Sequence, residues 1–130
     1  MSRPCIVRDL GCMKYADALA IQLSLARELK EDRGVDHLLF VEHPHVVTIG
    51  RNGKQSNVLV PAALCEQLGI ELFESDRGGD VTYHGPGQIV GYPVMDLRKW
   101  KRDVGAFLRA VAVKHKNVNT NVDKIIRFMI

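Results

Sequence analysis

Glycine is concentrated in one short stretch of this 130-residue chain. Residues 77–88, which read Arg-Gly-Gly-Asp-Val-Thr-Tyr-His-Gly-Pro-Gly-Gln, hold four of the 11 glycines. Glycine reaches backbone conformations that other residues avoid, and it lets a second chain or a ligand approach the backbone closely. The stretch therefore predicts two tight turns, at residues 77–80 and 84–87, beside short strands.

Two interpretations of these turns stay open from their chemistry alone. In the first, they are ordinary hairpin turns whose polar side chains lie in water. In the second, an arginine, a tyrosine and a histidine on tight turns form a binding site rich in hydrogen-bond donors. A phosphate- or dinucleotide-binding loop is excluded, because the stretch is not GxGxxG and no Gly-Lys-Ser/Thr follows it.

Apolar periodicity and turn residues predict alternating strands and helices over the rest of the chain. Helices are expected at residues 15–33, with Gly34 as the stop signal, at 61–68, and at 103–113 behind an Asp103 cap. Strands are expected at residues 6–10, 37–42, 46–50, 70–75, 80–83 and 88–94. This mixture, without repeat or linker, predicts an α/β (α+β) domain.

Composition places the chain among ordinary globular proteins, with 46% hydrophobic and 25% charged residues. No apolar run reaches the 18 residues that a membrane helix needs, and the N-terminus lacks an apolar signal core, so a cytoplasmic protein is expected. Residues 113–130 carry the whole net charge of +3. Four cations without interleaved aromatic residues do not indicate nucleic-acid binding.

The three cysteines, Cys5, Cys12 and Cys65, show no paired spacing. An odd number without a CxxC motif argues against a disulfide framework and against a zinc site. Each is expected to be a small, buried or half-buried residue in a reducing compartment. His43 and His45 flank a proline, but no third ligand is visible, so no metal site is predicted.

Residues 77–88 resemble the signature RGGxxTYHGPGQ of the lipoyl(octanoyl) transferase family. Residues 41–50 and 92–97 resemble the strands before and after that signature, and residues 103–110 resemble the helix that follows. The resemblance covers about residues 5–112. It predicts an octanoyltransferase-like domain at residues 1–112, incomplete at its C-terminal side, and a divergent basic tail at residues 113–130 that is less well packed.

The resemblance implies a mixed β-sheet flanked by helices, the fold of biotin and lipoate protein ligases. It also implies an acyltransferase of lipoate biosynthesis that needs no cofactor. Such enzymes take an octanoyl (or lipoyl) group from acyl carrier protein and pass it to a lysine. That lysine belongs to the lipoyl domains of 2-oxoacid dehydrogenases or to the glycine-cleavage H protein. The reaction proceeds through a cysteine thioester with a nearby lysine.

The same resemblance assigns substrate binding to eight consecutive residues. The glycines would let the backbone lie along the acyl chain, and the last two side chains would shape the pocket near the thioester. These roles suit a concave site that is mainly apolar with a few polar groups at its mouth. The eight residues are Arg77, Gly78, Gly79, Asp80, Val81, Thr82, Tyr83 and His84.

The family's lysine and cysteine follow the signature in a C-terminal segment that this sequence does not contain, since no cysteine comes after Cys65. No catalytic residue is therefore assigned, and we expect the 130-residue chain to transfer octanoyl groups poorly. A non-catalytic module that binds the acyl group or the carrier protein is an open alternative. A biotin or lipoate ligase relative is disfavoured, because the phosphate-binding elements that ATP requires are not visible.

Overall fold

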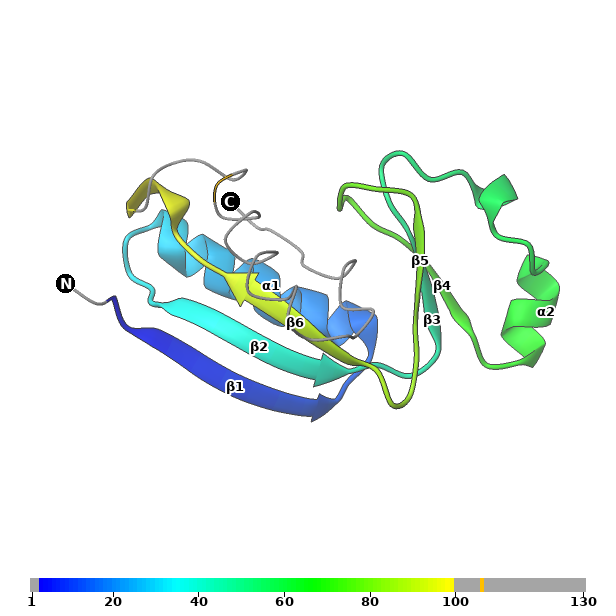
Figure 1. The fold of residues 1–130 in the computed structure, drawn as a ribbon, viewed down its shortest axis with the longest axis horizontal. Helices are drawn as coiled ribbons and strands as arrows, with labels where there is room; N and C mark the ends of the chain where they lie inside the picture. The colour runs from blue at the N-terminus through cyan, green and yellow to red at the C-terminus, as the bar shows by residue number, and fades with distance from the viewer. Residues whose placement is uncertain (1–2, 100–105, 107–130) are drawn as a thin grey trace. The chain divides into compact units, whose positions relative to one another are not determined.

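The computed structural model describes residues 3–99 and residue 106 (Figure 1). These residues form two three-stranded sheets, with strand orders β1-β2-β6 and β4-β3-β5. The chain divides into two compact units, one with residues 3–8, 21–39 and 91–99 and the other with residues 9–20 and 40–90. Of the predicted helix at residues 103–113 only Ala106 is described, and it is helical, whereas the basic tail lies outside the described residues.

The strands and helices follow the predicted order. In the mixed sheet, β3 pairs in parallel with β4 and antiparallel with β5. The predicted α/β (α+β) class with a mixed sheet is therefore confirmed. The strands are β1 (Cys5–Cys12), β2 (Asp36–Glu42), β3 (Val46–Ile49), β4 (Glu71–Glu74), β5 (Val81–His84) and β6 (Ile89–Val94), and the helices are α1 (Tyr15–Lys30) and α2 (Ala62–Gln67).

Helix α1 buries one face. Its buried residues recur every three or four positions, which is the spacing of a single helix face. The apolar periodicity from which the helix was predicted in the sequence is therefore that of this buried face. The buried residues are Tyr15, Ala18, Gln22, Ala26 and Leu29.

The C-terminus of α1 does not use the glycine that the sequence suggested. Asp32 adopts a left-handed conformation with φ 54°, and its amide donates to the carbonyl of Leu29. The amide of Arg33 donates to the carbonyl of Glu28. These two bonds are those of a Schellman motif, in which a left-handed residue ends the helix. The prediction that the helix continues to residue 33 and stops at Gly34 is therefore wrong.

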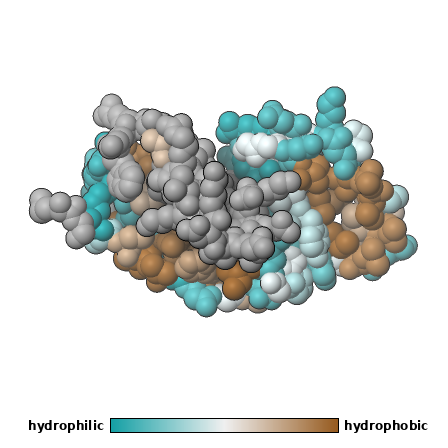
Figure 2. Space-filling model, viewed as in Figure 1, coloured by the Kyte–Doolittle hydropathy of each residue, from teal (hydrophilic) through white to brown (hydrophobic). Residues whose placement is uncertain are grey.

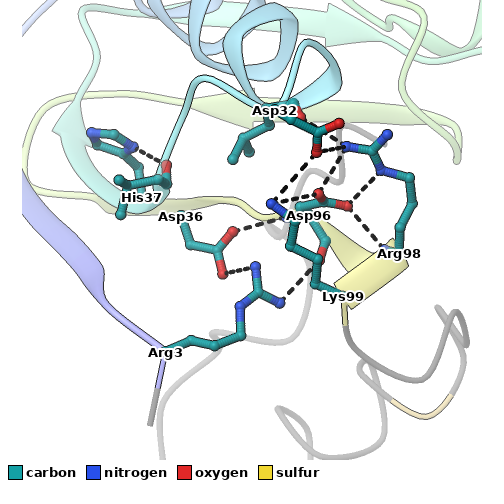
Figure 3. Close-up of polar contacts among 9 residues, drawn as sticks. Arg3, Asp32, Asp36, His37, Asp96, Arg98 and Lys99 are labelled. Atoms are coloured by element: carbon teal, nitrogen blue, oxygen red, sulfur yellow. Dashed lines mark hydrogen bonds and ion pairs between the residues drawn. The ribbon is translucent and has the colours of Figure 1, made fainter. Parts of the chain in front are cut away.

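Arg98, which lies in the short 3₁₀ turn η2 (Leu97–Lys99), forms hydrogen bonds with the C-terminal end of α1 (Figure 3). Its Nη2 donates to the carbonyl of Leu29 at 2.8 Å and to Asp32 at 3.1 Å. Its Nε and Nη2 also donate to the two carboxylate oxygens of Asp96, each at 2.9 Å. A cation at the last turn satisfies carbonyl groups that have no partner within the helix.

A second carboxylate extends this network (Figure 3). Asp36, at the start of β2, is buried and accepts the backbone N–H of Asp96 at 2.9 Å. Its other carboxylate oxygen pairs with Arg3 at 2.8 Å. Buried carboxylates are stable only when they are paired and hydrogen-bonded, and both conditions are met here.

Strand β1 is longer than predicted. It passes through Gly11, which takes a φ of 66° and donates its amide to the side chain of Asp9, and it ends at Cys12. Cys5 and Cys12 are exposed on this strand, so the expectation of burial is wrong for both. It is confirmed for Cys65, which is buried in α2.

The surface around α2 is apolar (Figure 2). Leu59, Leu64 and Leu68 are 93%, 41% and 58% exposed, whereas Cys65 is buried. A six-residue helix with one buried apolar side chain has little core of its own, so its position depends on the strands next to it. Among the described residues, no helix has the length and hydropathy needed to cross a bilayer.

Candidate functional site

The stretch 77–88 begins at one end of the mixed sheet. Ile49, the last residue of β3, pairs with Glu74 at the end of β4 and with Val81 at the start of β5. The chain between β4 and β5 therefore crosses the end of β3, since these two strands lie on opposite sides of it. We call residues 77–80 the signature turn.

Neither turn of this stretch is a hairpin turn. A hairpin joins neighbouring strands, but the signature turn joins β4 to β5 across β3. The second turn, at residues 84–87, joins β5 of one sheet to β6 of the other. The interpretation of both turns as ordinary hairpins is therefore wrong.

The chain after β3 is hydrogen-bonded to the signature turn. The amide of Gly50 donates to the carbonyl of Asp80 at 2.9 Å, and that of Arg51 donates to the carbonyl of Arg77 at 3.0 Å. The amide of Asn52 donates to the carbonyl of Gly79 at 3.1 Å. Three backbone bonds thus join two loops that are far apart in the sequence, and they fix the course of the turn.

Close contact between these loops requires glycine at two positions. A Cβ on Gly50 would collide with the carbonyl oxygen of Gly79 and would lie 2.9 Å from Nη1 of Arg77. Gly79 itself takes a φ of 89°, which a residue with a side chain adopts only with strain. Gly78 differs, because a Cβ there would meet nothing within 4 Å. The close approach of the two loops therefore depends on Gly50, although Gly50 lies outside the signature.

The guanidinium group of Arg77 forms hydrogen bonds with β3 and with the signature turn. Its Nε donates to the hydroxyl of Thr48 at 3.0 Å, and its Nη2 donates to the carbonyl of Thr48 at 2.7 Å. Nη2 also donates to the carbonyl of Asp80 at 2.9 Å, and Nη1 donates to that of Gly78 at 3.0 Å. Thr48 is fully buried in β3. Arg77 thus binds both the middle strand and the turn that crosses its end.

The side chain of Asp80 holds a further loop. Both of its carboxylate oxygens accept from Nδ2 of Asn57, at 3.0 and 3.1 Å. Asn57 lies in the 3₁₀ turn η1 (Gln55–Asn57), which belongs to the polar loop after β3. The loop at residues 51–57 is therefore anchored to the signature turn at both of its ends.

Strand β5 separates the last two predicted site residues. Successive side chains of a strand point to opposite faces of the sheet. His84 is 2% exposed, Tyr83 is 49% exposed, and Val81 and Thr82 are half-buried. The structure thus gathers Arg77, Gly78, Gly79 and Asp80 in one turn and places Tyr83 and His84 on opposite faces.

Tyr83 is held in place on its exposed face. Its hydroxyl lies 2.5 Å from Nδ1 of His45, and the two rings lie nearly parallel with centroids 6.0 Å apart. The tyrosine ring also lies over Gly85, where a Cβ would overlap its hydroxyl end and approach Nδ1 of His45 to 3.1 Å. Gly85 of the second turn therefore leaves room for the tyrosine–histidine pair.

His84 belongs to a buried aromatic cluster. Its ring is stacked on that of Tyr15, and it lies 5.7 Å from the ring of His43. Tyr15 also contacts Phe73 of β4, at a centroid distance of 4.9 Å, and its hydroxyl is hydrogen-bonded to that of Ser75. The cluster packs the first turn of α1 against the mixed sheet.

The surroundings of both histidines in this cluster favour the neutral form of the ring. Burial lowers the pKa of His84, the hydrogen bond with Gln88 opposes this effect, and the nearby His43 and Arg77 lower the pKa further. Burial likewise lowers the pKa of His43. Each Nδ1 faces an oxygen at 2.7 Å, the side-chain Oε1 of Gln88 for His84 and the carbonyl of Met13 for His43. Because a backbone carbonyl oxygen can only accept, Nδ1 of His43 carries a proton.

The cysteines do not lie in the signature turn. Desolvation raises the pKa of the Cys5 thiol above its ordinary value, and the nearby Asp36 carboxylate raises it further. A raised pKa disfavours the thiolate that nucleophilic catalysis needs. The described part of the chain also contains no group of three His, Cys, Asp or Glu side chains placed to bind a metal ion.

Sequence reasoning missed several residues that shape the turn. All of them come before the signature: Thr48, Gly50 and Asn57 contact residues 77–80, and His45 contacts Tyr83. One signal was available for Thr48, because a polar residue in an apolar strand needs a buried hydrogen-bond partner.

Comparison with known proteins shows which family the chain resembles in sequence. Residues 14–124 match the family model described as the lipoyl protein ligase A/B catalytic domain. An octanoyltransferase of Solibacter usitatus (strain Ellin6076) is 57% identical over 109 residues, which cover 84% of this chain and 50% of that protein. An octanoyltransferase of Geobacter metallireducens is 49% identical over 104 residues, which cover 80% of this chain and 46% of that protein.

A solved structure shares the fold. It is a T. acidophilum protein assigned as a lipoate protein ligase, with a TM-score of 0.50, 19% sequence identity, and coverage of 85% of this chain and 44% of that one. The chain spans about half the length of the curated relatives that it matches. Because the family model matches residues 14–124, well over half of the chain, the protein belongs to the lipoyl protein ligase A/B catalytic domain family.

Proposed function

We propose that this chain provides the acyl-recognition part of an octanoyltransferase. The reaction is transfer of an octanoyl (or lipoyl) group from acyl carrier protein to a lysine of a lipoyl domain. The acceptors are the lipoyl domains of 2-oxoacid dehydrogenases and the glycine-cleavage H protein, in the cytoplasm, as a step of lipoate biosynthesis. The observation that carries the proposal is the 57% identity to an octanoyltransferase over a region that includes the signature.

The geometry of the signature turn supports a binding role. Gly78 and Gly79 are exposed, and a Cβ on Gly78 would meet open space. An extended acyl chain can therefore lie against this backbone without displacing protein atoms. The backbone bonds to residues 50–52 and the bonds of Arg77 fix the turn before a ligand arrives. Such preorganisation reduces the entropy lost on binding.

The covalent chemistry needs groups that the described site does not supply. A thiolate attacks the thioester carbonyl of the donor, and the carrier thiol leaves with a proton. The lysine amine of the acceptor then attacks the new thioester, forms the amide and releases the enzyme thiol. Cys5 and Cys12 lie on β1 and Cys65 is buried in α2, so none of them lies in the signature turn. We infer that residues 1–130 bind the donor and that other residues supply the nucleophile.

Mass spectrometry tests this division of roles. The 130-residue chain is incubated with octanoyl-acyl carrier protein, and its intact mass and its affinity for the carrier are measured. We expect binding that is stronger for the octanoyl than for the unacylated carrier, and no octanoyl adduct. A stable adduct, lost in one of Cys5→Ala, Cys12→Ala or Cys65→Ala, would show that a cysteine of this chain is the nucleophile.

A pair of variants locates the binding. Gly78→Leu fills the space above the signature turn and should weaken binding of the octanoyl carrier. Gln67→Leu adds the same side chain at an exposed position of α2 and serves as the control. Equal affinities for both variants would show that the acyl chain does not lie on the turn.

The second candidate is a module that binds the carrier protein without any role in transfer. The same titration separates it from the first, because such a module binds acylated and unacylated carrier equally well. A ligase would instead bind ATP, and titration of the chain with ATP and octanoate tests that possibility directly.

A further inference from the structure

We propose that Thr48 and Arg77 are positioning residues for the acyl donor, and that Arg77 acts by shaping the signature turn without contacting the ligand. The identity of the ligand rests on the proposed function. The arrangement of the two residues rests on the hydrogen bonds between them.

The guanidinium of Arg77 has five N–H donors in a planar fork. Its Nε, Nη1 and Nη2 atoms make five hydrogen bonds to four acceptors, namely the hydroxyl and carbonyl of Thr48 and the carbonyls of Gly78 and Asp80. All four belong to the turn or to the strand that it crosses. The charge of Arg77 is therefore directed at the protein backbone beside the glycines.

The Thr48 hydroxyl forms hydrogen bonds with both Arg77 and β5. It accepts from Nε of Arg77 at 3.0 Å and from Nη2 at 2.8 Å, and its own proton is directed to the carbonyl of Thr82 at 3.5 Å. One donor and two acceptor sites are all that a hydroxyl offers. Because Thr48 is fully buried, any effect that it has on a ligand must pass through Arg77 or through β5.

This arrangement explains why an arginine stands at this position. A lysine ammonium is a single compact charge and cannot reach acceptors on both sides of the turn as the planar guanidinium does. Loss of the hydroxyl of Thr48 would leave the Nε–H group of Arg77 without its acceptor and would remove one of the three acceptors of Nη2. The turn would then be free to shift away from residues 50–52.

Two measurements on the same variants test the proposal. Amide hydrogen exchange reports the bonds from Gly50, Arg51 and Asn52 to the turn, and titration reports the affinity for octanoyl-acyl carrier protein. In Thr48→Val, which keeps the side-chain shape, we expect about tenfold faster exchange at these amides and about tenfold weaker binding. Thr48→Ser, which keeps the hydroxyl, should restore both values.

The double variant Thr48→Val/Arg77→Lys separates positioning from direct contact. Residues that act as one unit show non-additive effects, so the double variant should bind no more weakly than Arg77→Lys alone. Additive losses, or full binding by Thr48→Val, would overturn the proposal. If Thr48→Val does not fold, Arg77→Lys gives the same two readouts with the charge retained, and unchanged exchange would then overturn it.

The experiments distinguish an error in the proposed function from an error in the proposed role of Thr48 and Arg77. If the unaltered chain does not bind octanoyl-acyl carrier protein, the proposed ligand is wrong, whereas hydrogen exchange still decides whether Thr48 and Arg77 hold the turn. If the unaltered chain binds and Thr48→Val loses binding with normal exchange, the loss does not arise from movement of the turn and the proposal is overturned.

Discussion

The rings of Tyr15 and His84 lie parallel, with 11° between their planes and 6.4 Å between their centroids. His43 lies beside both, at 5.5 Å from Tyr15 and 5.7 Å from His84. Two buried imidazoles at this distance cannot both be charged without a large loss of hydration and mutual repulsion. The buried aromatic cluster beside β5 is therefore more stable while its histidines are neutral.

This neutrality predicts a dependence of stability on pH. Histidine in the unfolded chain has a pKa of about 6.5, and burial lowers the pKa of His43 and His84 below that value in the folded state. As the pH falls below about 6.5, the unfolded chain takes up protons that the folded chain does not bind, and the free energy of unfolding decreases. We expect the melting temperature to fall between pH 7.5 and 5.5, and to fall less in the double variant His43→Gln/His84→Gln. An unchanged slope in that variant would contradict the assignment.

The lowered pKa of Asp96 predicts a second decrease in the free energy of unfolding at more acidic pH. The hydrogen bond from Arg98 is the largest cause that lowers the pKa of Asp96 to about 2. A lowered carboxylate pKa contributes stability above the unfolded value of 3.8, and that contribution is lost as the pH falls through about 2. Asp96→Asn should lower the free energy of unfolding at pH 7 by about 1–3 kcal/mol, as measured by urea titration. Glu31→Gln, which removes a surface partner of Arg33, should change it much less, because that pair is exposed to solvent.

Two glycines of the loops at the end of β3 should respond differently to the same substitution. Gly50→Ala places a methyl group against the carbonyl of Gly79 and should destabilise the protein by about 1–3 kcal/mol. Gly78→Ala meets open space and should change stability by no more than about 0.5 kcal/mol. Chemical unfolding of the two variants gives both values. Equal losses would show that the contact between residues 50 and 79 is not formed in solution.

Gln22 predicts a stabilising substitution. Its side chain on α1 is 1% exposed, and its Nε2 has no hydrogen-bond partner among the described residues. A buried donor without a partner costs about 1–3 kcal/mol, so Gln22→Leu should raise the free energy of unfolding by about 1 kcal/mol. Gln22→Glu should lower it, because a charge would then be buried. Destabilisation by leucine would indicate that the amide is satisfied in solution.

The sequence was sufficient for elements whose signal is local. The buried face of α1 follows from apolar residues three and four positions apart, and the strands around the signature follow from their apolar residues and turns. The end of α1 was misplaced because Asp32 takes the left-handed conformation that glycine usually supplies. Aspartate can do so, and here its carboxylate also pairs with Arg98.

Strand pairing was beyond the reach of local patterns. Val46 pairs with His84 and Ile49 with Val81, and nothing in either strand alone specifies that partner. The role of Thr48 under the signature turn follows only from that pairing. The signature itself was visible as a cluster of glycines, whereas the residues that hold it in shape come from the strand and loop 23 or more positions earlier.

The strand order β4-β3-β5 also has a consequence for synthesis of the protein. The middle strand β3 leaves the ribosome first, and its last partner residue, His84, follows 38 positions after Val46. At about 5–20 residues per second, the edge of β3 that β5 covers stays open for roughly 2–8 seconds, whereas β4 is available earlier for the other edge. Open edges of an apolar strand are sites where nascent chains associate with one another. This interval ends when residues 77–84, which cross the end of β3 and form β5, have been translated. Synthesis of the signature therefore also ends the period in which nascent chains can associate through this edge.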